Sequence, residues 1–200
     1  MTSDYSQLND RYLTAIFASA ARLAVLRVFM LDPRRPYYQR QLEATSGLPI
    51  RAIQRELDRL TSIDLLYRRN EGKRAYYQLD TDHPLFPELR ALILKGAGPA
   101  DRLRATLSVL DPVRLAFLDE PSKRALVVTH AGPDTLPIDP GPFEVAVCTS
   151  ESFLRRLLES PGELDPFLGQ GVDLLGRRDD VIWRRIEAAG FCVAKGKDVP

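Results

Sequence analysis

Arginine and glutamine side chains recur in the N-terminal half of the chain at a spacing that suits contact with nucleic acid. One side of a predicted helix carries Arg51, Gln54, Arg55, Asp58 and Arg59, and its opposite side is apolar. Arginine forms two hydrogen bonds with guanine, and glutamine forms two with adenine, in the major groove of DNA. We therefore expect Arg51, Gln54, Arg55 and Arg59 to contact double-stranded DNA.

Two further groups of polar side chains are suited to holding a DNA backbone. Lys73 and Arg74 lie at the tip of a predicted β-hairpin, where they would reach a flanking groove or phosphates. Tyr38, Gln39 and Arg40 open a short predicted helix, and the N–H groups and side chains at a helix start commonly bind phosphate. The sequence thus predicts three DNA-contacting groups within about 40 residues of chain.

The charge distribution agrees with this location. The whole chain has a formal net charge of +1, but residues 1–98 carry 15 Lys and Arg against 11 Asp and Glu. Residues 34–74 alone carry 10 basic against 5 acidic side chains. A concentrated basic face attracts nucleic acid even when the whole chain is nearly neutral. The alternative is a solvated basic face that has no partner.

The elements that must position these residues follow from the spacing of apolar and helix-breaking residues. Asp32-Pro33 ends a first helical pattern, Gly47 ends a second, and Pro49 suits the first turn of a third. The predicted elements are helices at 8–31, 38–45, 49–60 and 84–95, and a hairpin at 65–79. A short helix, a glycine turn, a second helix and a hairpin form the order of a winged helix-turn-helix.

The C-terminal half has a different pattern, which begins after the breaker Gly96-Ala97-Gly98-Pro99. The predicted elements are helices at 101–110, 150–158 and 179–189, strands at 114–118, 125–129, 144–149 and 171–175, and a loop at 131–142. Ser150 is expected to be the N-cap of its helix. We predict an α+β protein with a winged helix-turn-helix domain at 1–98 and a small α/β domain at 99–200.

Residues 19–95 resemble a bacterial winged-helix domain of the arsenic-repressor type. The segments that carry the resemblance are Ala20-Ala-Arg-Leu-Ala-Val-Leu, Gln41-Leu-Glu-Ala-Thr-Ser-Gly-Leu, Gln54-Arg-Glu-Leu-Asp-Arg-Leu, Gly72-Lys-Arg-Ala-Tyr-Tyr and His83-Pro-Leu-Phe-Pro-Glu-Leu. The resemblance implies a transcriptional regulator that is usually dimeric. Residues 36–60 contain no cysteine, and His83 and His130 are isolated, so we expect no metal sensing.

The C-terminal half resembles the minimal nucleotidyltransferase domain that follows the winged helix in one subgroup of that family. The matching segments are Phe143-Glu-Val-Ala-Val-Cys-Thr-Ser-Glu-Ser-Phe-Leu-Arg-Arg-Leu, Asp165-Pro-Phe-Leu and Val172-Asp-Leu-Leu-Gly-Arg. Active members carry Gly-Ser and then two carboxylates that hold Mg²⁺, but here the carboxylate positions align with Lys123 and Ala125. The resemblance therefore implies a degenerate domain with no catalytic residues, no metal ligands and no cofactor.

Two alternatives stay open at this point. The first is an active nucleotidyltransferase with relocated carboxylates, for example Asp119 and Glu144. The second is an interaction module that has lost DNA binding as well. The regulator hypothesis leaves the effector unknown, and the sequence does not identify the operator.

Composition and apolar patterning complete the expectations. The chain is 44% apolar, no segment is apolar enough to span a membrane, and its polar start is unlike a signal peptide. Cys148 and Cys192 are expected to be free thiols of a cytoplasmic protein, with Cys148 buried and inert. We also predict a homodimer that reads two half-sites. Its contact would use six apolar residues, namely Leu13, Ile16, Phe17, Leu89, Leu92 and Ile93.

Overall fold

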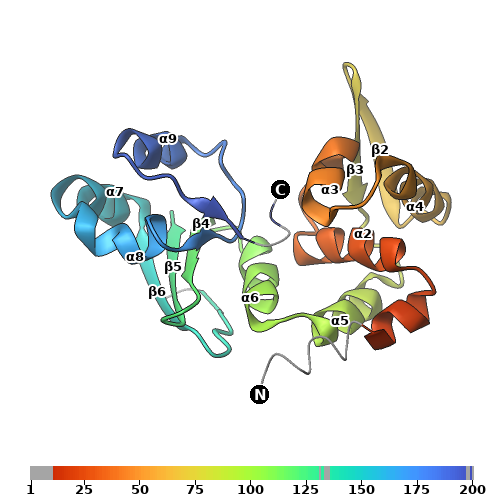
Figure 1. The fold of residues 1–200 in the computed structure, drawn as a ribbon, viewed down its shortest axis with the longest axis horizontal. Coiled ribbons are helices and arrows are strands. Elements are labelled where there is room, and N and C mark those ends of the chain that lie inside the picture. Colours follow the sequence, from red (N-terminus) through yellow and green to blue (C-terminus); the bar gives the residue numbers. More distant parts are fainter. Residues whose placement is uncertain (1–10, 131, 133–135, 197–198, 200) are drawn as a thin grey trace. The chain divides into compact units, whose positions relative to one another are not determined.

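The chain is an α+β protein made of two compact units (Figure 1). A computed structural model describes residues 11–130, 132, 136–196 and 199. The first unit extends to Ala105 and the second covers Thr106–Val199. The predicted breaker does separate two helices, because α5 (Phe86–Gly96) ends there and α6 (Pro99–Ser108) begins. The boundary between the two units falls seven residues after the predicted domain boundary, inside α6.

Unit 1 combines helices with a three-stranded antiparallel sheet of order β1-β3-β2. Besides α5 and the start of α6, its labelled elements are α2 (Ala20–Leu31), β1 (Tyr37–Tyr38), α3 (Gln39–Ser46), α4 (Ile50–Ser62), β2 (Leu66–Glu71) and β3 (Arg74–Leu79). The β2–β3 hairpin extends past α3 and α4 (Figure 1). The two-residue strand β1 is the only one of these elements without a counterpart in the sequence prediction.

The long N-terminal helix predicted from residue 8 to Leu31 is not continuous. Its described part is a helix over Arg11–Phe17 and then α2, bent by 105° relative to each other. Ala18 between them has a left-handed backbone with φ of 52°. The Ser19 side chain then caps α2 by accepting a hydrogen bond from the Arg22 amide at 3.1 Å. The apolar spacing continues through the bend, which is why the pattern predicted one helix.

The turn between α3 and α4 forms where the glycine predicted it. Gly47 adopts φ of 67° and its amide donates to the Glu43 carbonyl oxygen at 2.9 Å, which ends α3. Pro49 then precedes the first turn of α4. Leu42 and Ile53 are fully buried and hold both helices in the core of unit 1.

The predicted hairpin forms, and its turn is two residues long. Glu71 pairs with Arg74, so that Gly72 and Lys73 form the tip, and Gly72 adopts φ of 56°. Only Leu66 of the six β2 residues is buried. The outer part of the hairpin therefore presents its side chains to solvent on both faces.

Two of the six residues predicted to form a dimer contact belong to the core instead. Leu13 and Ile93 are buried in the same cluster as the residues of α2 and α4. Phe17, Leu89 and Leu92 are partly buried against that cluster. Ile16 alone of the six is largely exposed, at 64%. The apolar stripes on the first helix and on α5 are thus mostly used within unit 1.

Unit 2 is built on a five-stranded mixed sheet of order β6-β5-β4-β7-β8. The strands are β4 (Val113–Asp119), β5 (Arg124–Thr129), β6 (Glu144–Thr149), β7 (Val172–Asp173) and β8 (Ala194–Lys195). Its helices are α7 (Ser150–Glu159), the 3₁₀ helix η2 (Pro161–Leu164), α8 (Asp165–Leu168) and α9 (Val181–Ala188), with α7, α8 and α9 on one face of the sheet (Figure 1). The sequence predicted all of these except β8, η2 and α8.

Aromatic side chains join the helices of unit 2 to its sheet. The ring of Phe117 on β4 lies 6.2 Å from Phe153 of α7 and 6.0 Å from Trp183 of α9, in stacked arrangements. The N-cap of α7 is Thr149, whose hydroxyl accepts from the Ser152 amide at 3.2 Å, so the prediction of Ser150 was wrong by one residue. The Ser150 hydroxyl instead donates to the Thr129 carbonyl oxygen.

No single helix among the described residues is long and apolar enough to cross a membrane.

Candidate nucleic-acid interface

Four polar side chains of α4 line one shallow hollow of about 480 Å³, namely Arg51, Gln54, Arg55 and Asp58. All four residues are exposed. Within the described part of the chain, none of their side chains has a hydrogen bond or an ion pair. These groups are therefore available to a ligand without first breaking an internal contact.

Arg59, the fourth predicted α4 contact, is placed differently. Its Nη1 lies 3.3 Å from Glu56 Oε1, and its side chain, although 62% exposed, does not line the hollow. Solvent weakens this ion pair on the Arg59 side, whereas its Glu56 partner is nearly buried. Arg59 is thus paired with Glu56 of its own helix and lies beside the hollow.

Glu56 is a site residue that the sequence prediction missed. Its side chain is 7% exposed, and it accepts from Arg22 Nε at 2.9 Å and from the Ser19 hydroxyl at 3.4 Å. These contacts join α4 to the start of α2, immediately after the bend. The signal in the sequence was its position, because Glu56 lies in the same helical stripe as the buried Ile53 and Leu60.

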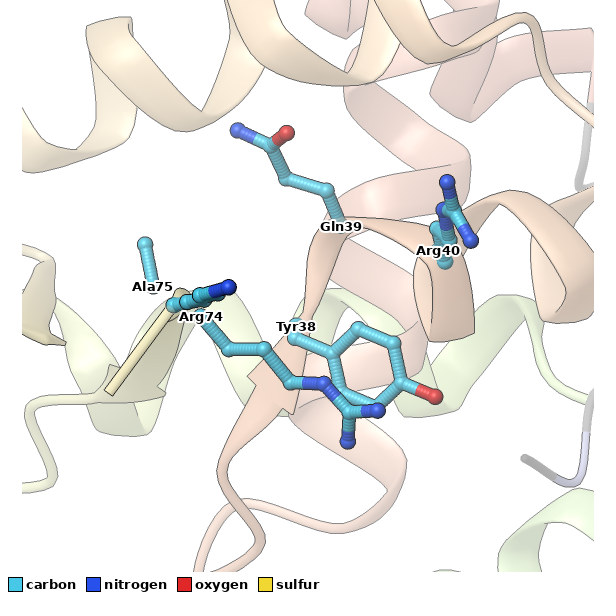
Figure 2. Close-up of a pocket in the computed structure, with 6 residues that line it drawn as sticks. Tyr38, Gln39, Arg40, Arg74 and Ala75 are labelled. Atoms are coloured by element: carbon cyan, nitrogen blue, oxygen red, sulfur yellow. The ribbon is translucent and has the colours of Figure 1, made fainter. Parts of the chain in front are cut away.

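The hairpin tip and the start of α3 meet at a second hollow of about 370 Å³. It is lined by Tyr38, Gln39, Arg40, Lys73, Arg74 and Ala75 (Figure 2). The two segments lie side by side because β1 pairs with β3 in antiparallel register, with Tyr38 opposite Tyr76. Two groups predicted from distant parts of the sequence therefore form one polar surface.

Side chains in this second hollow are held by the sheet and by α3. The guanidinium of Arg74 lies 4.9 Å from the centre of the Tyr38 ring, and Figure 2 shows the two side chains stacked together. The Tyr38 ring also meets Tyr76 edge-on at 5.8 Å. In Figure 2 the Gln39 side chain points away from Tyr38 and Arg74. Its amide nitrogen is 3.5 Å from the Tyr77 hydroxyl.

Arg68 and Arg69 on β2 add positive charge to the hairpin and were not among the predicted contacts. Both are exposed. Arg69 is 2.6 Å from Glu71, but this pair is more than half exposed and contributes little. The signal was present in the sequence, since an exposed strand of a hairpin carries cations at successive positions.

Burial of Tyr37, next to the hollow, raises the pKa of its hydroxyl, and the charge of Asp32 raises it further.

The carboxylate positions of the nucleotidyltransferase resemblance lie on and before β5 in unit 2. Strand β5 begins at Arg124, one residue before the predicted strand, and Lys123 occupies the preceding turn with φ of 54°. Ala125 is fully buried in the sheet. Neither position presents an oxygen ligand.

The relocated carboxylates of the enzyme alternative have a cation between them. The strand registers place Asp119 beside Arg124, and Arg124 beside Glu144, on three neighbouring strands. Two strand spacings separate the carboxylate-bearing backbones by about 10 Å, whereas Mg²⁺ ligands lie about 2.1 Å from the ion. Asp119 is also engaged locally, because it accepts a hydrogen bond from the Ser122 hydroxyl.

Other residues that could do chemistry have structural surroundings. Among the described residues, no three or more His, Cys, Asp and Glu side chains are grouped to hold a metal ion. His83 accepts from the Leu85 amide through Nδ1, so that Nε2 donates to the Ile63 carbonyl oxygen at 3.1 Å. Cys148 and Cys192 are free thiols. Cys148 is half-buried rather than buried, and this burial raises the pKa of its thiol.

The chain matches no family model, no curated protein and no solved structure.

Proposed function

We propose that unit 1 binds double-stranded DNA and that the protein is a sequence-specific transcriptional regulator of the winged-helix type. The observation that carries this proposal is a set of exposed α4 side chains that have no hydrogen bond or ion pair with the described residues, namely Arg51, Gln54 and Arg55. Exposed cations on a protein surface usually pair with a nearby carboxylate or are simply solvated. Here two of them flank a glutamine on one helical stripe, in the chemistry that reads guanine and adenine edges.

The order of elements supports the same proposal. Helix α4 follows α3 through a tight glycine turn, and its exposed stripe is opposite the buried one, as a recognition helix requires. The hollow between the start of α3 and the hairpin tip offers Arg40, Lys73 and Arg74 to backbone phosphate. In this proposal α4 lies in the major groove and the hairpin reaches the flanking backbone.

The salt dependence of binding by a Lys73→Ala protein tests this arrangement. Lysine contacts to phosphate release condensed counterions, so the logarithm of affinity falls linearly with the logarithm of salt concentration. We expect Lys73→Ala to weaken binding to all duplexes and to reduce this slope by about 1. Lys195→Ala, which removes an equal charge from unit 2, serves as the matched control. Equal affinity and slope for wild type and Lys73→Ala would exclude the hairpin from the interface.

We propose further that unit 2 is a nucleotidyltransferase-like domain without catalytic activity and that the protein acts in the cytoplasm. The position of Arg124, on the strand between those of Asp119 and Glu144, supports this proposal, because a cation there repels Mg²⁺. We expect calorimetry to detect no Mg²⁺-dependent ATP binding. Binding that disappears in an Asp119→Asn protein would favour the enzyme alternative. Absence of any salt-sensitive DNA binding would favour the interaction module.

A further inference from the structure

We infer that Asp58 is a specificity-determining residue of the interface, which accepts a hydrogen bond from the N4 amino group of a cytosine. This inference rests on the proposed function and deepens it. The Asp58 carboxylate lies within a surface that is otherwise suited to the polyanionic DNA backbone. A negative charge there weakens binding to phosphate, so its presence needs a compensating contact.

The geometry places Asp58 among the base-reading groups and not on the flank. Residues 51, 54, 55 and 58 have the spacing i, i+3, i+4 and i+7, which forms a single stripe along a helix. They line one hollow, in contrast to Arg59 and Glu56, which face the α2 side of α4. The stripe is about 10 Å long at 1.5 Å per residue, which corresponds to about three stacked base pairs at 3.4 Å each.

Asp58 is also free of the partner that would neutralise it. Arg55 is one turn earlier on the same face, and an Asp–Arg pair at this spacing is common on helices. In the described part of the chain, however, neither side chain has an ion pair or a hydrogen bond. Both therefore remain available to different bases, Arg55 as a donor and Asp58 as an acceptor.

The chemistry of the groove selects the base that suits a carboxylate. An ionised carboxylate only accepts hydrogen bonds, and cytosine presents its N4 amino donor in the major groove. Guanine presents acceptors there, which repel a carboxylate. Adenine presents a donor beside an acceptor, a pair that an amide matches better than a carboxylate does. Asp58 thus selects cytosine and discriminates most strongly against guanine.

Binding selection with the full chain and a pool of duplexes with a randomised core tests the inference. The pool first gives the preferred site of the wild-type protein, and single-position variants of that site then give relative affinities. We expect one position at which replacement of cytosine lowers wild-type affinity at least about fivefold, with guanine the worst base. In Asp58→Asn this preference should move toward adenine, and in Asp58→Ala it should disappear.

Two comparisons separate the possible results. Asp64→Asn removes the same charge just beyond the end of α4 and should keep the cytosine preference. A uniform gain in affinity of Asp58→Asn, with every base preference unchanged, would overturn the inference while leaving the proposed function intact. Absence of any duplex binding by the wild-type protein would instead contradict the proposed function. Position 58 is exposed and tolerates polar substitution, so we expect each variant to fold. Melting curves check this expectation.

Discussion

Residues of α4 differ sharply in how they are held, and this difference assigns them roles. Glu56 is nearly buried and bound by Arg22, whereas Arg51 and Asp58 are exposed and have no side-chain partner among the described residues. A buried carboxylate is stabilising only when hydrogen bonds replace the water it has lost. Glu56 has these bonds, so its role is to set the position of the helix, while the exposed stripe is left to meet a ligand.

Replacement of Glu56 by glutamine should therefore destabilise unit 1. The uncharged amide cannot keep both the Arg22 and the Arg59 interactions, and we expect a loss of about 1–3 kcal/mol in the free energy of unfolding. All seven tyrosines of the chain lie before residue 78, so tyrosine absorbance during denaturation follows unit 1. Asp58→Asn, on the exposed side of the same helix, should change stability by less than about 0.5 kcal/mol. Equal stabilities of the two variants would show that the Glu56 contacts do not matter.

A single glycine determines how closely β7 can approach its neighbours in unit 2. A Cβ atom at Gly171 would lie 2.6 Å from the Phe167 carbonyl oxygen and 2.9 Å from that of Leu118. Both are backbone atoms, of α8 and β4, and cannot rotate away. The close approach of three elements thus depends on the absence of a side chain at this position.

We expect Gly171→Ala to cost unit 2 about 1–3 kcal/mol, the usual effect of overpacking a core. Trp183 is the only tryptophan of the chain and lies in this unit, so its fluorescence during denaturation reports the change. Gly162→Ala is the matched control, because a Cβ there has no atom within 4 Å. A Gly171→Ala protein as stable as the control would mean that the backbone relaxes without loss.

The elements that the sequence predicted are those whose signals are local. Apolar periodicity and Gly47 located α3 and α4, and the glycine turn located the hairpin. The bend at Ala18 escaped prediction because alanine rarely adopts a positive φ and favours helix continuation. The strands β1 and β8 are two residues long and exist only through their partners in the sheets. Glu56 escaped because its partners, Ser19 and Arg22, are more than 30 residues away.

Two exposed apolar side chains near the N-terminus bear on whether the protein forms a dimer. Tyr12 and Ile16 on the first described helix are 60% and 64% exposed, although the neighbouring Leu13 is buried. Exposed large apolar side chains at neighbouring turns of a helix are common where a second protein covers them. Two copies of α4 would also supply the contacts that a specific DNA site needs, since one short helix reads few bases.

We therefore expect the protein to sediment as a homodimer at micromolar concentration and to protect two related half-sites. An Ile16→Asp substitution should convert it to a monomer, because a charge cannot be buried in an apolar contact without a partner. Arg155→Asp, which changes an exposed residue of α7 in unit 2, is the control and should leave the dimer intact. A wild-type monomer, both free and bound to DNA, would contradict the homodimer.

The position of β2 at the edge of its sheet has a consequence for solubility. With the order β1-β3-β2, one side of β2 has no neighbouring strand among the described residues, and such an edge can pair with the edge of another chain. Charged side chains on an edge strand oppose this pairing, and Arg68 and Arg69 occupy β2. The same cations would thus keep the free protein from aggregating through its hairpin. Experiments that remove several hairpin cations at once would mix lost binding with precipitation, whereas single substitutions keep the two effects apart.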